Sequence, residues 1–333
     1  MATPIRNIAV IGDGGWGTTL AIYLARKKYQ VTLWGAFAEY ARQIQKTRIN
    51  RKYLPGVEIP QSVVITDDLA GAVGPAQLLV LASPSQYLRS VLKKLKKFSL
   101  ADKVVLSVVK GIETTTLSRM SEVIAQELGK IPMAVLSGPT IAMEVVKGLP
   151  STAVIASSHP RLAKTLQEIF HSETFRIYTN SDVVGLELGG SLKNIIAIAC
   201  GVCDGLGYGS NTKAAILTRG LVEMARLGKA MGARSQTFSG LGGLGDLVTT
   251  CVSSQSRNRF VGEQLGKGIP IKNILLSMNM VAEGVETVKA AYKLSQKYNV
   301  PMPITTEVYN IISRGKSPKA AVTDLMTRKI KAE

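Results

Sequence analysis

The sequence predicts an α/β protein in two parts, a doubly wound sheet followed by an all-α domain. Apolar runs of strand length alternate with helical patterns over about the first 185 residues. A glycine-rich turn, Gly12-Asp13-Gly14-Gly15-Trp16-Gly17, directly follows the first of these runs. Beyond about residue 185, strand patterns become sparse and helical periodicity continues to the end of the chain. These three observations place the domains at residues 1–185 and 186–333.

The composition is that of a globular protein large enough for two cores. The chain has 333 residues, of which 46% are hydrophobic and 19% are charged. These values are not those of a disordered chain. The N-terminus lacks the apolar core of a signal peptide. We expect no apolar run of the roughly 20 residues that a membrane span needs. The sequence therefore predicts a soluble, cytoplasmic protein.

The basic balance of the chain suits an anionic partner. Its formal net charge is +18. However, the basic residues are spread along the chain, and no motif interleaves them with the few aromatic residues. Exposed helix faces account for most of them, and attraction of an anionic substrate is the second interpretation. We expect no nucleic-acid partner and no insertion into a membrane.

Cysteine and histidine offer little chemistry. Cys200 and Cys203 have redox-motif spacing, but they lie inside an apolar run and not at an exposed helix start. We interpret them as small buried residues. His159 and His171 stand in polar, surface-like contexts. No ligand spacing links the three cysteines and two histidines, so no metal site is predicted.

The N-terminal segment has the pattern of a Rossmann-like dinucleotide-binding unit. Residues 5–11 are typical of a buried strand and residues 18–28 of a helix. Between them, Gly12 allows a tight turn, Gly14 lets the backbone approach a pyrophosphate, and Gly17 lets helix and strand pack closely. N–H groups at the helix start would hold the pyrophosphate. We predict that this domain binds NAD or NADP.

The end of the second predicted strand, residues 31–34, does not choose between these cofactors. An acidic residue there would select NAD, and an arginine would favour NADP. The chain has Gly35-Ala36-Phe37, with Glu39 somewhat late. These residues therefore do not indicate whether the cofactor carries a 2′-hydroxyl, as NAD does, or a 2′-phosphate, as NADP does.

Three later strands end in turns that could meet a ligand. Further strands are predicted at 62–66, 78–82, 104–108, 134–136, 152–156 and 174–178. The turns are 83–86, Lys110-Gly111 and 137–140. Ligands in such sheets bind beyond the carboxyl ends of the strands, so these turns should line one crevice. Lys110 either contacts a substrate there or is a surface lysine.

Lys193 and Asn194 stand at the head of a nearly all-apolar segment of helical length. A buried ammonium is costly, so it is kept for pairing with a carboxylate or for chemistry. The alternative is a lysine whose stem is buried and whose ammonium reaches water. A second glycine-rich turn, 238–246, follows no strand and ends in Asp246. Its glycines should bring the chain against a ligand or another helix.

Residues 256–259, Ser-Arg-Asn-Arg, place hydroxyl, guanidinium and amide donors together. Such donors suit a phosphate, because a guanidinium bonds two oxygens at once. An exposed helix start fits the same four residues equally well.

Taken together, these motifs closely resemble the NAD(P)-dependent glycerol-3-phosphate dehydrogenases of bacterial type. The resemblance spans nearly the whole chain. It rests on Gly12-x-Gly-x-Trp16-Gly17-Thr18, Asn50-x-x-Tyr53-Leu-Pro-Gly56, Lys110-Gly-Ile-Glu113, Ser137-Gly-Pro-Thr140, Glu187-Leu-Gly-Gly-x-Leu-Lys193-Asn194, Asp204-Gly-Leu-Gly207, Gly242-x-x-Gly245-Asp246, Ser256-Arg-Asn258 and Glu283-Gly-Val285.

The resemblance implies reversible hydride transfer between sn-glycerol 3-phosphate and dihydroxyacetone phosphate, which would supply glycerophospholipid synthesis, and it implies a homodimer. It makes Lys193 the acid–base residue at the substrate C2 oxygen, with Lys110 and Asp246 as further catalytic residues. Burial and Lys110 would both disfavour the charged form of Lys193. The implied cofactor positions, with the fingerprint glycines, are Gly12, Gly14, Gly15, Trp16, Gly17, Lys110, Ala142, Arg257 and Glu283. The implied substrate contacts are Lys110, Gly138, Thr140, Lys193, Asp246 and Ser256, with Arg257 and Asn258 at the phosphate.

The chain departs from the family pattern at three positions. Ala36 stands where a basic residue is common, Gly15 where serine or alanine is common, and Ile141 where phenylalanine is common. The first departure leaves a preference for NADP in doubt.

Two other functions compete with this one. A related two-domain reductase acting on a hydroxy acid would share the fold and a helix lysine, but it would bind a carboxylate in place of a phosphate. A nucleotide-sensing regulator would bind nucleic acid in a salt-dependent manner and would not turn over.

Overall fold

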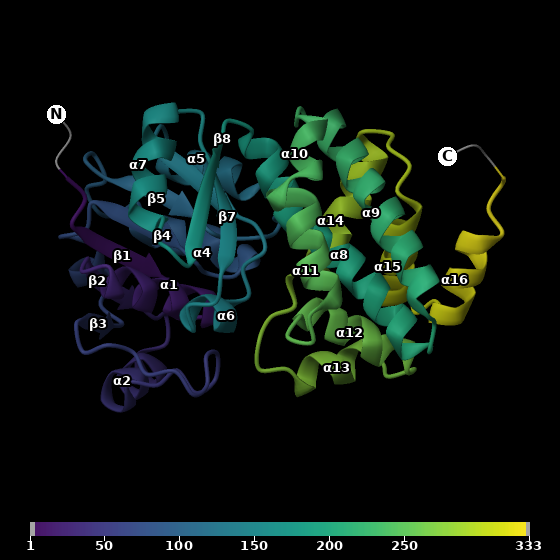
Figure 1. Ribbon diagram of the computed structural model, residues 1–333, viewed down its shortest axis with the longest axis horizontal. Helices are drawn as coiled ribbons and strands as arrows, with labels where there is room; N and C mark the ends of the chain where they lie inside the picture. The colour runs from purple at the N-terminus through teal and green to yellow at the C-terminus, as the bar shows by residue number, and fades with distance from the viewer. Residues whose placement is uncertain (1–3, 331–333) are drawn as a thin grey trace. The chain divides into compact units, whose positions relative to one another are not determined.

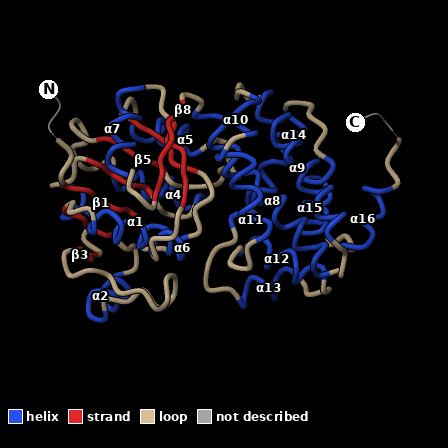
Figure 2. The backbone as a smooth tube through the Cα atoms, in the orientation of Figure 1, coloured by secondary structure: helices blue, strands red, loops and turns tan. Residues whose placement is uncertain are grey.

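Two units make up the fold. In this computed structural model, which describes residues 4–330, one unit takes residues 4–110 with 120–183 and the other takes 111–119 with 184–330. Figure 2 shows the strands in the first unit, whereas the second consists of helices and loops. The predicted class, a Rossmann-like doubly wound sheet followed by an all-α domain, is confirmed.

The first unit contains one eight-stranded sheet, ordered β3-β2-β1-β4-β5-β6-β7-β8. Its strands are β1 (Asn7–Ile11), β2 (Gln30–Trp34), β3 (Val63–Thr66), β4 (Leu78–Leu81), β5 (Val104–Ser107), β6 (Met133–Ser137), β7 (Ser151–Ala156) and β8 (Phe175–Asn180). Neighbouring strands are parallel except β6 and β7, which are antiparallel. The carboxyl ends of β1 to β6 therefore share one edge.

The two faces of the sheet bury separate cores, as a doubly wound sheet requires. Along β1, Ile8 and Val10 pack on one face with α1, α2 and α7, while Ala9 and Ile11 pack on the other with α3, α4 and α5. This alternation is the period of two that a strand imposes. The helices of this unit are α1 (Gly15–Arg26), α2 (Ala38–Thr47), α3 (Leu69–Val73), α4 (Ser85–Leu95), α5 (Met120–Leu128), α6 (Ala142–Val146) and α7 (Pro160–Phe170) (Figure 1).

The second unit is built around α8 (Val183–Gly205), whose residues from Gly185 to Cys203 are buried. The other helices are α9 (Ser210–Ala230), α10 (Ser235–Ser239), the π-helical turn η1 (Leu241–Gly245), α11 (Asp246–Val252), α12 (Arg257–Gly266), α13 (Ile271–Ser277), α14 (Glu283–Lys297), α15 (Pro303–Arg314) and α16 (Pro318–Met326). Helices α12 and α14 run through the same core as α8, with Val261, Val288 and Ala291 buried in it.

By length and composition alone, α8 could cross a membrane, and it is the one helix in residues 4–330 of which this is true. The expectation that no segment would reach this length is therefore wrong, because small residues and single polar residues extend the apolar run. Its most apolar window is 89% buried inside the protein. Packing in the core of the second unit accounts for the apolar character of α8.

A short excursion, residues 111–119, joins the second unit although β5 and α5 on either side belong to the first. Ile112 and Arg119 form an isolated antiparallel bridge, and Ile112 is buried in the helical core. Arg119 then forms an ion pair with Glu187 of α8, with 2.5 Å between Nη1 and Oε2. This pair fixes the segment against the helix that carries Lys193.

Candidate active site

The glycine-rich turn after β1 shows three glycines in three roles. Gly12 has φ +126°, and a Cβ there would lie 2.8 Å from the carbonyl of Ala82. A Cβ on Gly17 would lie 1.9 Å from the Gly12 oxygen, so only glycine lets α1 approach the turn. At Gly14, in contrast, no atom of residues 4–330 outside its chain neighbours lies within 4 Å of a Cβ position. The backbone at Gly14 thus faces open space, as the sequence predicted.

The start of α1 is suited to bind an anion. Gly14 is its N-cap residue and provides no side-chain hydrogen bond to the first turn. The helix has 12 residues, so its N-terminus carries the partial positive charge of a helix macrodipole. Three buried side-chain atoms at this turn also lack a hydrogen-bond partner among the described residues: Oδ2 of Asp13, Nε1 of Trp16 and Oγ of Ser83. Orphaned polar atoms of this kind call for a ligand, and a dinucleotide fits them.

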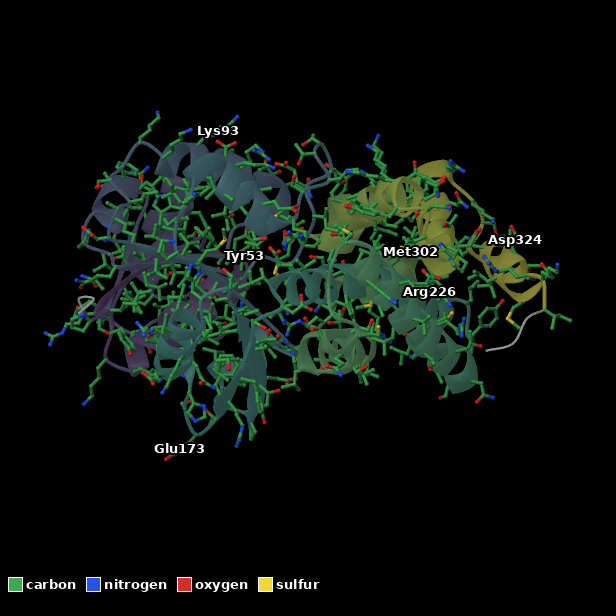
Figure 3. All side chains as sticks on the ribbon, turned by 90° about the horizontal axis from the view of Figure 1, so that it is seen from above. Tyr53, Lys93, Glu173, Arg226, Met302 and Asp324 are labelled. Carbon is green, nitrogen blue, oxygen red and sulfur yellow. The ribbon has the colours of Figure 1, made fainter. Side chains whose placement is uncertain are left out.

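Asn50 holds a second loop against the glycine turn. Its Nδ2 donates to the Asp13 carbonyl and to Thr18 Oγ1, both at 2.7 Å. Its Oδ1 accepts from Tyr40 Oη at 2.6 Å and from the backbone N–H of Tyr53 at 3.1 Å. The chain at Tyr53, labelled in Figure 3, reaches Gly15, where a Cβ would lie 2.6 Å from the Tyr53 oxygen. A larger residue at position 15 would displace this loop.

Lys110 follows β5 and lies at the carboxyl edge of the sheet. Its Nζ donates to the Gly138 carbonyl at 2.9 Å and lies 3.4 Å from Thr140 Oγ1. Gly138 follows β6 with φ +137°, and a Cβ there would lie 3.0 Å from the Cα of Ala153. Two of the predicted turns thus meet around the Lys110 ammonium. Thr19 Oγ1 of α1 donates to the Ala142 carbonyl at 3.3 Å, which brings α6 to the same edge.

Lys193 is buried and paired. Its exposed fraction is 6%, and its Nζ lies 2.6 Å from Oδ1 of Asp246, which is 1% exposed. A second donated hydrogen bond of 2.6 Å goes to Thr250 Oγ1. The alternative in which this ammonium reaches water is wrong. Burial disfavours the charged form, as expected, but the contact with the Asp246 carboxylate opposes this effect, and that contact was not foreseen.

The second glycine-rich turn places this carboxylate. Gly242 and Gly243 belong to η1, and Asp246 is the first residue of α11. A Cβ on Gly189 of α8 would lie 2.3 Å from the Gly242 oxygen. The glycines therefore bring the turn against another helix, which was one of the two predicted outcomes. This close approach is what allows Asp246 to reach Lys193.

Thr250 was missed by the sequence analysis. It lies one helical turn after Asp246 on α11, so both side chains lie on the same face. Its hydroxyl donates to the Asp246 carbonyl at 2.7 Å, which leaves the oxygen lone pairs directed at Lys193. The spacing of four residues was the signal that could have revealed it.

The predicted phosphate residues lie around the start of α12. Ser256 is the N-cap residue and accepts from the Arg259 N–H at 3.2 Å. Asn258 is buried; it donates to Oδ1 of Asn194 at 2.8 Å and accepts from the Gly284 N–H at 2.9 Å. Asn258 thus ties α12 to α8 and α14.

Arg257 differs from its neighbour Asn258 in being exposed. One of its guanidinium nitrogens donates to the Val281 carbonyl at 2.8 Å. Burial lowers the pKa of this guanidinium, and the charge of Glu283, the first residue of α14, opposes that shift. Arg257 therefore places a positive charge at the start of α12, where an anion could bind.

The cysteines and histidines are placed as predicted. Cys200 and Cys203 are buried in α8, and His159 and His171 are exposed. Burial raises the pKa of the Cys203 thiol to about 12.

Comparison with known proteins decides the family. The N-terminal domain of NAD-dependent glycerol-3-phosphate dehydrogenase matches residues 7–163, and the C-terminal domain of the same family matches residues 182–323. The chain belongs to the NAD-dependent glycerol-3-phosphate dehydrogenase family. This confirms the resemblance predicted from the motifs.

Individual members of the family are similar over their whole length. A glycerol-3-phosphate dehydrogenase (NAD(P)+) of Chlorobium phaeobacteroides is 50% identical over 98% of this chain and 99% of its own. The same enzyme of Thermoanaerobacter sp. is 49% identical over 98% of both chains. A crystal structure of glycerol-3-phosphate dehydrogenase from Coxiella burnetii is 38% identical, with TM-score 0.95, over 98% of this chain and 100% of that one.

A more distant reductase is similar in fold alone. A ketopantoate reductase from Ralstonia eutropha covers 95% of this chain with a TM-score of 0.61, but it is 15% identical.

Proposed function

We propose that this protein reduces dihydroxyacetone phosphate to sn-glycerol 3-phosphate with NADH or NADPH and also catalyses the reverse reaction, supplying glycerophospholipid synthesis. Family membership supports the reaction. The observation that carries the mechanism is the buried cluster of Lys193, Asp246 and Thr250. It holds an ammonium that can act as proton donor to a carbonyl oxygen.

Lys193 is the general acid and base in this proposal. During reduction its ammonium donates a proton to the C2 oxygen, and during oxidation the neutral amine takes the proton from the hydroxyl. A cofactor held at the glycine turn after β1 would supply the hydride to the substrate carbon in reduction and take it up in oxidation. Asp246 keeps the ammonium charged and oriented until the proton moves, and Thr250 fixes its direction. Neither has to accept the proton itself.

The two units divide the binding work in this proposal, with the cofactor on domain 1–185 and most of the substrate contacts on domain 186–333. Open backbone at Gly14 and the orphaned atoms of Trp16 and Ser83 support cofactor binding at the first turn. The proposed cofactor residues are Gly12, Gly14, Gly15, Trp16, Gly17, Lys110, Ala142, Arg257 and Glu283. The proposed substrate residues are Lys110, Gly138, Thr140, Lys193, Asp246, Ser256, Arg257 and Asn258.

Arg257 and Asn258 are assigned to the substrate phosphate in unequal roles. The guanidinium of Arg257 supports a direct contact, because it can donate to two phosphate oxygens at once. Asn258, which binds Asn194 and Gly284, is best suited to hold the start of α12 in place.

The test is substitution of the proposed acid–base residue. Lys193→Ala should lower kcat by about 10²–10⁴-fold, the usual contribution of a general acid or base. NADH affinity, measured by fluorescence titration, should stay near the wild-type value. Activity is measured as loss of nicotinamide absorbance with dihydroxyacetone phosphate, using NADH and then NADPH.

A matched control is Lys267→Ala, which removes an exposed lysine paired with Glu263 in the same unit. It should leave kcat unchanged, since exposed pairs contribute little. Wild-type turnover by Lys193→Ala would refute the acid–base assignment. If the wild-type protein bound the cofactor but did not oxidise NADH or NADPH with dihydroxyacetone phosphate, the proposed substrate would be wrong and hydroxy acids would be tested next.

A homodimer and a cytoplasmic location stay predictions from the family resemblance. Sedimentation equilibrium at working concentration tests the first, and a monomer there would contradict it.

A further inference from the structure

The end of β2 lacks the acidic residue that usually contacts the adenosine ribose. The strand ends at Trp34, whose carbonyl accepts from the Gly12 N–H at 2.9 Å. Gly35 follows, and its N–H donates a hydrogen bond to the Thr66 carbonyl at 3.0 Å. Neither Gly35 nor Ala36 has a side chain that could contact a ribose hydroxyl.

The side chain of Asp13 occupies the space that a residue at position 35 would fill. A Cβ built on Gly35 would lie 2.4 Å from Asp13 Oδ2 and 2.8 Å from its Cγ. Asp13 is 9% exposed, and Oδ2 has no hydrogen-bond partner among residues 4–330. The Asp13 backbone is fixed by Asn50 and Thr18, which both donate to its carbonyl. The carboxyl is therefore held in place beside the glycine turn.

We propose that Asp13, from the first glycine-rich turn, replaces the missing acidic residue of β2 and makes the protein select NAD(H) over NADP(H). The proposal rests on cofactor binding at this turn, which is part of the proposed function. Asp13 Oδ2 would accept a hydrogen bond from a ribose hydroxyl. This bond would give the buried oxygen the partner that it lacks among residues 4–330.

A 2′-phosphate would be disfavoured at this position for two reasons. It would bring negative charge to a carboxylate, and it would need space that the Asp13 side chain fills. Ala36 supplies no guanidinium to compensate. Burial raises the pKa of the Asp13 carboxyl, while its own backbone hydrogen bond and the charge of Lys52 oppose this rise. A protonated carboxyl would still accept from the hydroxyl.

The experiment measures binding of NADH and of NADPH without substrate, by calorimetry or by nicotinamide fluorescence. The wild-type protein should bind NADH at least about tenfold more tightly than NADPH, because a site built for a hydroxyl discriminates strongly against other groups. Asp13→Asn should reduce this ratio by about tenfold, mainly through tighter NADPH binding. Asp13→Ser serves as a second variant, since it keeps a polar group and is smaller.

The control is Glu39→Gln, which removes an exposed acidic residue from the first turn of α2. It should leave the ratio unchanged. Equal binding of both cofactors by the wild-type protein, or a ratio that moves with Glu39 and not with Asp13, would overturn the proposal. Binding of neither cofactor would instead refute cofactor binding at this turn, and dihydroxyacetone phosphate turnover plays no part in the readout.

Discussion

Gly14 in the first glycine-rich turn, residues 12–17, and Gly243 in the second, residues 238–246, use the same residue type for opposite purposes. In the first, the position of a Cβ on Gly14 has no atom of the described residues within 4 Å, apart from its chain neighbours. In the second, Gly243 is buried, and a Cβ there would lie 2.2 Å from the Phe238 oxygen. One turn leaves its backbone open for a ligand. The other gives up side-chain volume so that helices can touch.

The element before each turn explains the difference. The first turn links β1 to α1 and ends in a helix N-terminus at the carboxyl edge of the sheet, where anions bind. The second links α10 to α11, and its backbone packs on α8. Its contribution to chemistry is indirect, because it positions Asp246 at Lys193. Substitution of Gly14 should therefore affect cofactor affinity, whereas substitution of the closely packed glycines at the second turn should affect stability.

The largest effect is expected for Gly189→Ala, which disrupts the close contact between α8 and the second turn. The new Cβ would lie 2.3 Å from the Gly242 carbonyl, and neither backbone can yield easily. Overpacking of this kind costs about 1–3 kcal/mol of unfolding free energy. Displacement of the turn should also lower kcat by moving Asp246. Urea unfolding followed by far-UV circular dichroism measures the first effect.

Gly242→Ala is the matched control for this contact. Its Cβ would meet Cδ1 of Leu186, the end of a flexible side chain that can rotate away. The cost should be clearly smaller than for Gly189→Ala. Equal free energies of unfolding for the two variants would show that the close approach of Gly189 to the Gly242 carbonyl does not stabilise this turn.

A smaller effect, on affinity alone, is expected for Gly14→Ala in the first turn. Its φ of −65° and ψ of 174° suit alanine, so stability should not change. The methyl group would enter the space offered to the cofactor, and the dissociation constant for NADH should rise about tenfold, or ~1.4 kcal/mol. Gly209→Ala is the control, since Gly209 is also an N-cap glycine with nothing within 4 Å. A loss of stability without loss of affinity would reverse the assignment of the first turn.

Local pattern was enough to predict most of the fold. Each of the eight predicted strands exists, and the strand-turn-helix context identified the first glycine turn. Strand periodicity carries no direction, so the antiparallel pairing of β6 with β7 was not predicted. The excursion 111–119 was also missed, because its place is set by contacts with Glu187 and the core around α8.

The site shows the same division between local and long-range information. Lys193 and Asp246 could each be singled out by chemistry, but their contact spans 53 positions and appears only in three dimensions. Likewise, the sequence shows that Gly35 lacks an acidic side chain. It does not show that Asp13 fills the space beside it, since that depends on the register of β1 against β2.

The smallest effect is expected for alkylation of Cys200-x-x-Cys203 in the native protein. Like the glycine-rich turns, this pair is a sequence motif, but only its spacing suggests a function. Burial is the main cause that raises the pKa of Cys203 to about 12, with Cys200 and Asp204 adding to it and Lys213 opposing it. At pH 8 the thiolate fraction is then roughly one in ten thousand, and the thiolate is the reactive species. Native protein should resist iodoacetamide at this residue, whereas the same protein in urea should be alkylated at all three cysteines. Mass spectrometry of the alkylated peptides measures both. Labelling of Cys203 in the native state at the rate of the unfolded chain would mean that α8 opens readily, and the core around Lys193 would then be far less rigid than its contacts indicate.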